Sequence, residues 1–535
     1  LRARAYDAAG NVSPVSGVLV TVSDPPGNGD TYASPSGVDA GNSVCSQANP
    51  CRSIAQAAAL APANKTVWLM NGDYTGVTQP GPIAIPAGLT LRALTPGLAG
   101  IGQQVVLQGS ATVVGVVIRR NGFGDFGSIA ASAGNVTLDG VKAVGYSANG
   151  SGFPAVLALS GSVHATMTPG GIADYADLLA PAGQNVSIFA TLAGNAWFTV
   201  NGGTFAGAKL GGADGVSGAF NRGAFNLAGS SKLELNNVVL DVDSSGIFMF
   251  GDATQVALNN TQLRAGVNTG TGYGIYAAKG TPQVTLVDSS ITGFENTYSR
   301  GSVGLYVGAF SHPGAAATLT TSNSTIGGAD VGVFVTELAA SPSSLTWTGT
   351  DTTVSGNLFG GVVCRDACSV DLTGGAISGN GTQIAMFASG GPVFHGGLWM
   401  AMAAKNYFLR LRNVQVVDNR SVSGPNTDTA FNSGVTIGGS ASSGFDLGSL
   451  GTPGNNVFAG NTTGAQTSGL NVGVAPGVTV RAVGNTWIAN TQGADAAGHY
   501  VLGSGPCGAS SCNLGGTSSP GPNFRVTSGT LRLAE

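Results

Sequence analysis

The chain has 535 residues, of which 87 are glycine and only 9% are charged. Its formal net charge of −4 and the scatter of its basic residues disfavour nucleic acid as a partner. No apolar run reaches the length of about 18 residues that suggests a transmembrane helix, whereas an apolar content of 42% is enough for a long core.

Residues 1–24 have the pattern of two strands joined by a turn. The strands are expected at Leu1–Tyr6 and Val18–Val22, and the turn at Asp7–Pro14. The turn sequence Asp-Ala-Ala-Gly-Asn-Val-Ser resembles the last hairpin of bacterial immunoglobulin-like or fibronectin-III-like modules. An isolated hairpin is only marginally stable in water, so three interpretations stay open. The segment is the edge of a larger upstream module, an end cap on the next domain, or a strand pair donated to a neighbouring subunit.

The chain starts at Leu1 without an initiator Met or a signal peptide, so we expect a processed or partly visible product. Residues 25–30 have the composition of a linker, and we predict one long domain over residues 31–502. Near its start, Ile54–Leu60 is the best helix candidate, because its apolar residues share one face with Ala61. Such a helix suits the end of a β-structure, where it would cover apolar side chains and open strand edges.

The middle of the chain repeats one short pattern: apolar, any residue, apolar, two polar residues or Gly, two variable residues, apolar. Leu233–Leu240 and Val256–Leu263 are two copies. Further copies begin at positions 284, 319, 347, 370 and 409, so the spacings from 233 onward are 23, 28, 35, 28, 23 and 39 residues. Looser copies lie at Val136–Ala143, Phe198–Phe205 and Val480–Trp487.

Each copy describes a strand, a corner and the start of a second strand. A Gly followed by an apolar run, as at Gly246–Phe250, adds a third strand to each turn. One such turn cannot bury its apolar face alone, but stacked turns can. The pattern therefore predicts an all-β fold of the parallel β-helix type, whereas a propeller would need more even units of about 40–45 residues. Asn residues at equivalent corners are expected to stack in side-chain ladders: Asn237, Asn260, Asn323 and Asn413.

Two segments interrupt the pattern. Residues 168–179 are expected to form a corner loop, and residues 391–407 a long excursion that accounts for the 39-residue spacing. Residues 503–535 are predicted to form a disulfide loop and a tail that caps the far end.

Several motifs at the start of the domain carry a resemblance. They are Thr31-Tyr-x-Ser-x-x-Gly-x-Asp, Pro50-Cys-Arg-Ser-Ile, Val67-Trp-Leu-x-Asn-Gly-x-Tyr and Ile83-x-Ile-Pro-x-Gly-Leu-Thr-Leu. Together they resemble the entry of right-handed parallel β-helix proteins of the pectate-lyase-like superfamily, and most of all a group of bacterial secreted or surface proteins. The resemblance covers about residues 31–500. It implies a right-handed solenoid with an N-terminal capping helix and assigns no catalytic set to this chain.

The six cysteines form three close pairs, which favours three disulfides and an oxidising, extracellular or cell-surface location: Cys45 with Cys51, Cys364 with Cys368, and Cys507 with Cys512. A metal site is the alternative. It is weak because no pair has CxxC spacing and the histidines at 164, 312, 395 and 499 are far apart. We expect no cofactor and no metal.

Outward charges at alternate strand positions are the candidates for chemistry. Asp241 and Asp243 are expected to share one outer face, and Arg410 and Arg412 another, with Asp418 and Arg420 close behind. Most other coils offer only Thr, Ser, Gly and Asn, so these charges are interpreted first as solvating groups. An ice-binding face would need regular Thr ranks, and the runs Thr318–Thr321 and Thr346–Thr350 are predicted to be local.

The sequence favours a secreted bacterial surface rod with a structural or adhesive role. Its partners would be surface glycans or copies of itself, assembled through the N-terminal strands. The alternative is a carbohydrate-active enzyme, a lyase or hydrolase, that uses Asp241, Asp243, Arg410 and Arg412. A further alternative is a trimeric fibre similar to a phage tailspike.

Overall fold

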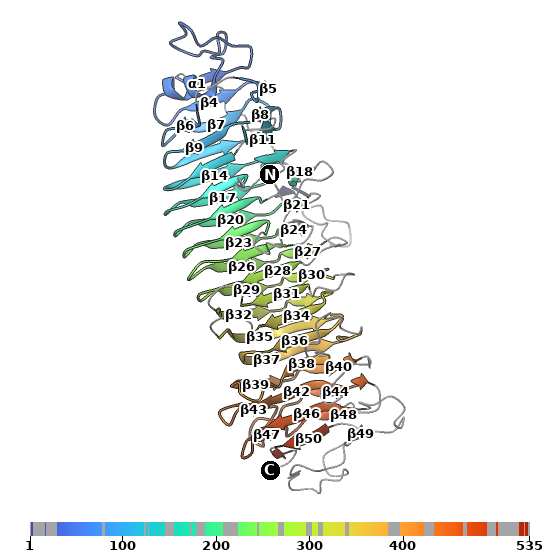
Figure 1. The fold of residues 1–535 in the computed structure, drawn as a ribbon. Coiled ribbons are helices and arrows are strands. Elements are labelled where there is room, and N and C mark those ends of the chain that lie inside the picture. The colour runs from blue at the N-terminus through green and yellow to red at the C-terminus, as the bar shows by residue number, and fades with distance from the viewer. Residues whose placement is uncertain are drawn as a thin grey trace, which may run out of the picture.

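The computed structural model describes residues 2–3, 16–17, 29–77, 81–121, 125–126, 128–144, 155–171, 174–177, 188–206, 223–242, 245–265, 272–295, 302–308, 314–336, 342–382, 396–421, 433–463, 468–488, 499–500, 524–528 and 530–532. They form a right-handed parallel β-helix whose coils stack into an elongated rod (Figure 1). The predicted fold class is therefore confirmed.

Each coil contributes one strand to each of three parallel stacks, which we call stacks A, B and C in chain order. Stack A runs through β3 (Thr31–Ala33), β4 (Thr66–Leu69), β7 (Thr90–Ala93), β10 (Ala111–Val114), β14 (Asn135–Asp139), β17 (His164–Thr168), β20 (Trp197–Asn201), β23 (Lys232–Asn236), β26 (Gln255–Asn259), β29 (Gln283–Val287), β32 (Ala316–Ser322), β35 (Ser344–Ser355), β37 (Ala367–Ser378), β39 (Tyr407–Arg412), β43 (Gly444–Asp446), β47 (Thr479–Arg481) and β51 (Thr530–Arg532).

Stack B runs through β5 (Gly72–Asp73), β8 (Ala99–Ile101), β11 (Val116–Asn121), β15 (Lys142–Val144), β18 (Asp174–Asp177), β21 (Thr204–Ala206), β24 (Val239–Val242), β27 (Gln262–Ala265), β30 (Ser290–Thr292), β33 (Thr325–Gly327), β40 (Gln415–Val417), β44 (Val457–Ala459) and β48 (Thr486–Ile488). The long strands β35 and β37 pass through both stacks, which joins A and B into one 32-stranded sheet.

Stack C is a separate 15-stranded sheet. It runs through β6 (Ile83–Ile85), β9 (Gln104–Leu107), β13 (Ser128–Ala131), β16 (Leu157–Leu159), β19 (Ala190–Leu192), β22 (Phe225–Leu227), β25 (Ile247–Met249), β28 (Tyr273–Ala277), β31 (Val303–Val307), β34 (Val331–Val335), β36 (Gly360–Cys364), β38 (Gly396–Met400), β42 (Ser433–Gly439), β46 (Ser468–Val474) and β50 (Phe524–Ser528).

A single helix closes the N-terminal end of the rod, as the sequence predicts. Helix α1 spans Ile54–Leu60, and its buried residues are Ile54, Ala57 and Ala58. Ser53 caps its first turn, because its side chain accepts a hydrogen bond from the backbone N–H of Gln56. The buried alanines let the helix lie close to the first strands.

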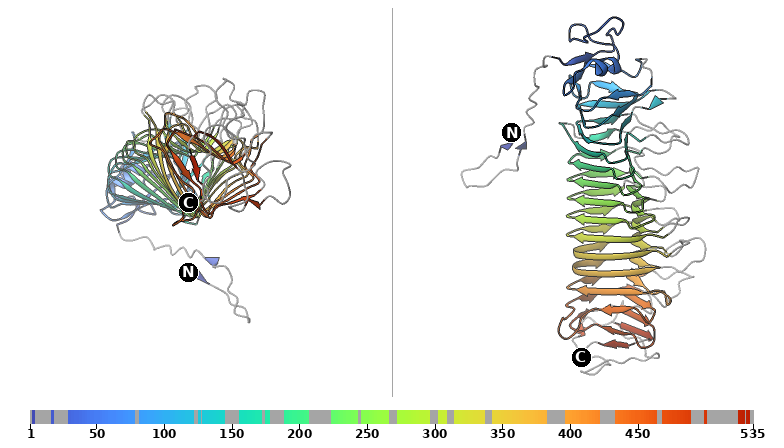
Figure 2. Two further views of the ribbon diagram at one scale, coloured as in Figure 1. Left: turned by 90° about the horizontal axis from the view of Figure 1, so that it is seen from below. Right: turned by 90° about the vertical axis from the view of Figure 1, so that its left-hand side faces the viewer.

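The N-terminal segment forms a separate two-stranded sheet in the described residues. Strand β1 (Arg2–Ala3) pairs antiparallel with β2 (Ser16–Gly17), and Figure 2 shows this pair beside the rod. The pairing lies just before the second strand that the sequence predicts at Val18–Val22, a segment outside the described residues. Which of the three interpretations of residues 1–24 holds stays a prediction.

One continuous apolar core fills the rod from Ala33 to Leu531. Alternate strand residues point inward, so neighbouring coils place like residues over one another, as in the register Leu233 to Val256 to Val284. Stacking, rather than any one coil, therefore buries the apolar face.

The corner between stacks A and B has a fixed backbone conformation. Its residue has positive φ in successive coils, for example 57° at Asn237 and 47° at Asn260. Asn and Asp tolerate this left-handed region better than other side-chain residues do. Asn260 Nδ2 donates to Asn237 Oδ1 (2.8 Å), as predicted, whereas Asn323 Nδ2 donates to Oδ1 of Asp288 (2.7 Å), a corner residue that the predicted ladder did not include.

A second ladder, which the sequence analysis missed, is buried at the corner between stacks B and C. The Nδ2 groups of Asn357, Asn380 and Asn419 each donate to the Oδ1 of the next member, at 2.7–2.9 Å, and the last acceptor is Asn461. Beside them runs a column of glycines in stack C. A Cβ at Gly397 would lie 2.5 Å from the carbonyl oxygen of Gly434 and 2.9 Å from the Asn419 side chain. Glycine is required there because asparagine and the next strand already fill the space.

Two of the three predicted disulfides lie in the described residues. Cys45 bonds to Cys51 beside the first coil, and Cys364 bonds to Cys368 between β36 and β37. The pair Cys507 and Cys512 lies outside the described residues.

Two local predictions were wrong in part. Within the expected corner loop at 168–179, Asp174–Asp177 is strand β18 and pairs with β15 and β21. Within the expected excursion at 391–407, Gly396–Met400 is strand β38 of stack C. Weak local patterns misled in both places, because pairing with adjacent coils decides strand formation.

Candidate functional site

The structure separates the charged residues that the sequence analysis grouped as candidates. Asp241 lies on stack B, where its Oδ2 is 3.1 Å from Nη2 of Arg264 on the next coil. Arg410 lies on stack A, several coils away. Asp243 is outside the described residues. Asp241 and Arg410 therefore cannot act on the same bond of a substrate.

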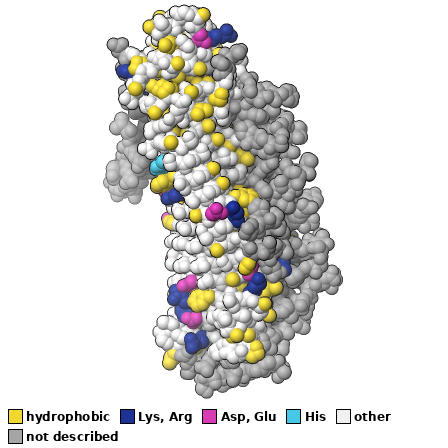
Figure 3. Space-filling view, turned by 60° about the vertical axis from the view of Figure 1, so that its left-hand side comes forward, with side chains coloured by type: hydrophobic (Ala, Val, Ile, Leu, Met, Phe, Trp, Pro, Cys, Tyr) yellow, Lys and Arg dark blue, Asp and Glu magenta, His cyan; other side chains and the backbone are white. Residues whose placement is uncertain are grey.

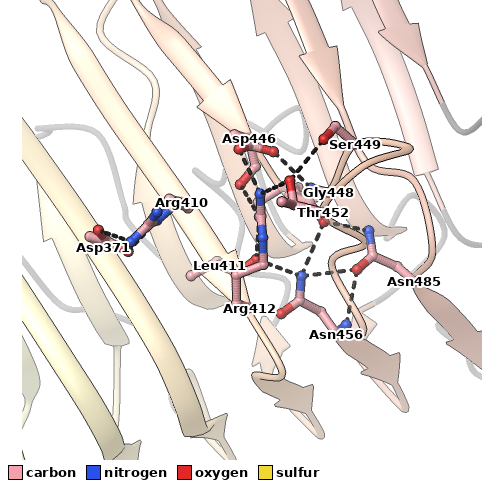
Figure 4. Close-up of polar contacts among 11 residues, drawn as sticks. Asp371, Arg410, Leu411, Arg412, Asp446, Gly448, Ser449, Thr452, Asn456 and Asn485 are labelled. Atoms are coloured by element: carbon pink, nitrogen blue, oxygen red, sulfur yellow. Dashed lines mark hydrogen bonds and ion pairs between the residues drawn. The ribbon is translucent and has the colours of Figure 1, made fainter. Parts of the chain in front are cut away.

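Arg410 and Arg412 share the outer face of β39, as predicted, but each engages a different neighbouring coil. Arg410 forms a two-point ion pair with Asp371 of β37, through Nε (2.7 Å) and Nη2 (2.6 Å). This hydrogen bonding raises the pKa of Arg410 further above its ordinary value. Arg412 Nη2 lies 2.6 Å from Asp446 Oδ2 of β43, and its Nη1 donates to the Asp446 carbonyl oxygen. Figure 4 shows the two pairs side by side on adjacent strands.

The remaining sequence candidates do not join this group. Asp418 forms the corner between stacks B and C with a φ of 54°, and Arg420 follows it in the short strand β41 (Arg420–Ser421). His164 lies on β17, in the N-terminal half of the rod. His312 and His395 are outside the described residues, and His499 lies in β49 (His499–Tyr500) at the far end.

An exposed aromatic ring next to Arg410 is the residue that sequence reasoning missed. Phe408 is 42% exposed and precedes Arg410 by two positions on the same outer face of β39. A Cβ at Gly444, its neighbour on β43, would lie 3.5 Å from the Phe408 ring, so the ring covers the space above that glycine. The alternation of Phe408, Arg410 and Arg412 with the buried Leu409 and Leu411 was the available signal.

We call Phe408 with Asp371, Arg410, Arg412 and Asp446 the Phe408 patch. Its two carboxylates and two guanidinium groups have formal charges that cancel. It offers an apolar ring, carboxylate acceptors and the exposed guanidinium of Arg410, whereas Arg412 is largely covered and donates to Leu411, Asp446 and Thr452. Such a surface suits a ligand that both donates and accepts hydrogen bonds and has no net charge.

Trp197, the other exposed aromatic residue on stack A, has a different environment. His164 of the preceding coil stacks on its ring with centroids 4.2 Å apart. Lys232 of the following coil places Nζ 4.2 Å from the ring centroid. Since the two neighbours come from opposite sides, both ring faces are covered and the 36% exposure of Trp197 belongs to its edge.

Threonines form a rank along stack A that the sequence analysis did not expect. The register links Thr66, Thr90, Thr112, Thr137, Thr166 and Thr199, and after Glu234 and Ala257 it continues through Thr285, Thr320 and Thr348. The prediction that Thr ranks are only local was therefore wrong. Coils of unequal length hide the rank in the linear sequence.

The outward side chains of β26, β29, β32 and residues 344–350 of β35 are uncharged, and we call this surface the uncharged track. The charged residues Asp288 and Asp351 lie at its edge, on the corner next to stack B. The track lies between the ion pair of Lys232 with Glu234 and the ion pair of Asp371 with Arg410. In Figure 3 charged side chains are few on a mostly uncharged face, and in several of their small groups opposite signs adjoin.

Stack C has an outward aromatic row that is not exposed. Phe248, Tyr276, Tyr306 and Phe334 follow one another in register, with ring centroids 4.4–5.4 Å apart. Tyr276 and Tyr306 are each only 3% exposed. Burial raises the pKa of Tyr306 to about 12. This row packs as a second apolar cluster and offers little surface to a ligand.

Among the described residues, no group of three or more His, Cys, Asp or Glu side chains could hold a metal ion. Within the same residues, no helix is long and apolar enough to cross a membrane.

Comparison with known proteins adds little to this geometry. No family model and no curated protein matches the chain. Among solved structures, it is similar to the A-module of the mannuronan C-5 epimerase AlgE6 of Azotobacter vinelandii. The two are 13% identical, the match covers 92% of this chain and 96% of that one, and the TM-score is 0.28. At that TM-score the likeness supports no argument, so the description of this chain depends on its own strand pairing and surface.

Proposed function

We propose that this chain is an adhesive rod on the outside of a bacterial cell and that it binds neutral glycans at the Phe408 patch. The observation that carries the proposal is the exposed Phe408 ring, which covers Gly444 beside two ion pairs whose charges cancel. The apolar face of a sugar ring packs on an aromatic ring, and its hydroxyls can donate to carboxylates and accept from guanidinium groups.

The charge balance of the patch favours neutral sugars over polyuronates. A polyuronate needs an excess of cations along its binding surface, whereas Arg410 and Arg412 are each bonded to an aspartate. The exposed Arg481, in register with Asp446 on the next coil, adds a cation only at the C-terminal end of the patch. The two disulfides support a location in an oxidising compartment.

The enzyme alternative has less support. Asp371 and Asp446 lie on either side of Arg410 along stack A, about 10 Å apart at about 4.8 Å per coil. Two carboxylates near that separation can hydrolyse a glycosidic bond only if one of them holds a proton. Both are instead held in place by ion pairs with Arg410 and Arg412 on the same surface. Neither carboxylate is therefore free to approach a glycosidic oxygen.

Calorimetric titration of the full chain with neutral oligosaccharides and with oligogalacturonate tests the proposal. We expect a neutral sugar to bind with an affinity that does not depend on salt concentration. The affinity should fall at least tenfold in Phe408→Ala. Leu98→Ala is the matched control, because Leu98 is also an exposed apolar residue but lies near the N-terminal end of the rod. Equal affinity in Phe408→Ala and the native chain would refute the proposal.

Two further measurements separate the alternatives. Release of reducing ends or unsaturated products, abolished by Asp371→Asn, would identify an enzyme instead of an adhesin. A trimeric mass in light scattering would favour a tailspike-like fibre.

A further inference from the structure

The uncharged track begins where the Phe408 patch ends. From Phe408 the register passes to Ser369, Thr346, Thr318 and Gln283, one residue per coil. A parallel rank on the same face passes from Arg410 to Asp371, Thr348, Thr320 and Thr285. The patch and the track are therefore one continuous surface that follows the rod axis.

The side chains of the track repeat along that axis and not across it. Thr318 and Thr320 lie on β32, Thr346 and Thr348 occupy the same positions on β35, and all four are exposed. These two coils thus present the same hydroxyl groups about 4.8 Å apart, and β29 continues the two rows with Gln283 and Thr285. Across the strands the face ends after a few residues, at the positive-φ corner next to stack B.

A compact ligand would use only one row of such a surface. A polymer that lies along the axis would contact every row. Once its first sugar is bound, each further contact forms within the same complex, so many weak hydrogen bonds add up to a higher overall affinity. The outward side chains of the track carry no charge, and the exposed Asp288 and Asp351 at its corner would repel an anionic polymer, so a neutral polymer fits this surface best. Hydroxyl and amide side chains both donate and accept, as sugar hydroxyls do.

We infer that the ligand is an extended neutral polysaccharide that lies along the rod axis, with one sugar on Phe408 and the following sugars on the uncharged track. This inference rests on the proposed function and adds the ligand's length, direction and charge. The contact surface from Phe408 to Gln283 is about 20 Å long at about 4.8 Å per coil.

The test measures affinity against oligosaccharide length. For neutral oligosaccharides of one series, affinity is expected to rise with length until the chain spans about 20 Å, and then to level off. The double substitution Thr320→Val and Thr348→Val removes two hydroxyls and keeps the β-branched shape. We expect it to lower the affinity for long oligosaccharides about tenfold and to leave the affinity for the shortest oligosaccharide that binds unchanged.

Thr325→Val with Thr353→Val is the matched control. These threonines are paired in register on adjacent coils of stack B, away from the track. Affinity for long chains should be unchanged in this variant. A loss equal to that of the Thr320 and Thr348 pair would overturn the inference.

The outcomes separate the inference from the proposed function. If sugars bind through Phe408 with an affinity that depends neither on length nor on the threonines, the inference is wrong and the proposed function stands. If no neutral saccharide binds, both are wrong. Inhibition of ice recrystallisation that Thr320→Val with Thr348→Val abolishes, without saccharide binding, would assign the track to ice. A mass in solution that falls in the same variant would assign it to a second copy of the chain.

Discussion

Replacing Asn419 by leucine tests whether the buried asparagine ladder holds the corner between stacks B and C. Asn419 is 2% exposed, and both ends of its amide are used. Its Nδ2 donates to the carbonyl oxygen of Ile377 (2.8 Å) and to Asn461 Oδ1 (2.9 Å). Its Oδ1 accepts from the backbone N–H of Asn380 (3.3 Å) and from Asn380 Nδ2 (2.9 Å). Leucine has nearly the same shape, so the substitution removes the polar atoms and leaves little cavity.

The expected loss of unfolding free energy follows from the buried polar groups that lose a hydrogen-bond partner. The N–H of Asn380 and the carbonyl of Ile377 would each lose this bond in a buried place. A buried polar group without a partner costs about 1–3 kcal/mol, so Asn419→Leu should lose about 2–6 kcal/mol of unfolding free energy. The side chains of Asn380 and Asn461 keep other bonds, to Val354 and Val416, which confines the damage to one coil.

Thermal unfolding followed by circular dichroism, with amide hydrogen exchange to locate the change, is the assay. Exchange should accelerate in the coils around Asn419 before the rest of the rod, because coils of a solenoid interact mainly with their neighbours. Asn260→Gly is the control. It removes an exposed ladder bond at a corner where φ is 47°, a conformation that glycine accepts. We expect a loss within about 1 kcal/mol there. Equal melting temperatures for Asn419→Leu and the native chain would refute the reasoning.

Three further predictions concern the glycine column, the helix cap and the tyrosines. Gly397→Ala should destabilise the rod by about 1–3 kcal/mol in thermal unfolding, since its Cβ meets backbone at 2.5 Å, whereas Gly451→Ala, with nothing within 4 Å, should not. Ser53→Ala should lose about 1 kcal/mol and expose the first coil to proteolysis, and Ser53→Asp should restore it. Burial raises the pKa of Tyr306 to about 12. The contribution of Tyr306 to the unfolding free energy is therefore complete below about pH 10 and is lost as the pH rises through about 12, and the unfolding free energy falls there by about 1.4 kcal/mol per pH unit. In alkaline unfolding followed by tyrosinate absorbance, the unfolding free energy should fall less steeply with pH in Tyr306→Phe than in the native chain. An unchanged slope would contradict this assignment.

The repeat pattern was sufficient to predict the fold. Inward apolar residues, corner asparagines and the glycine before each strand of stack C describe one coil, and only stacking can bury its apolar face. The capping helix Ile54–Leu60 was predicted with the same bounds. The short strand β18 was missed, because its pairing with adjacent coils compensates for a weak local pattern.

The candidate site was only half visible in the sequence. Alternation on β39 predicts that Arg410 and Arg412 point outward. It cannot show that Asp371 and Asp446 are their partners, because these lie 39 and 34 residues away in sequence. The Thr rank was missed for the same reason: unequal loops shift each threonine by a different number of residues. Register between coils is the missing information, and it comes only from the fold.

Each strand of the β-helix lies across the rod, so the hydrogen bonds between coils point along its axis. A force that pulls the two ends apart therefore loads these bonds in tension, one coil at a time, and not in shear across many strands at once. The coil at the end opens first and lengthens the chain by its own residues, and the coils behind it follow one by one, each adding a similar length, as with the 23 residues of the coil that begins at Leu233. A tether built in this way lengthens in small steps under load, and the coils that have not yet opened keep their surface rows in register.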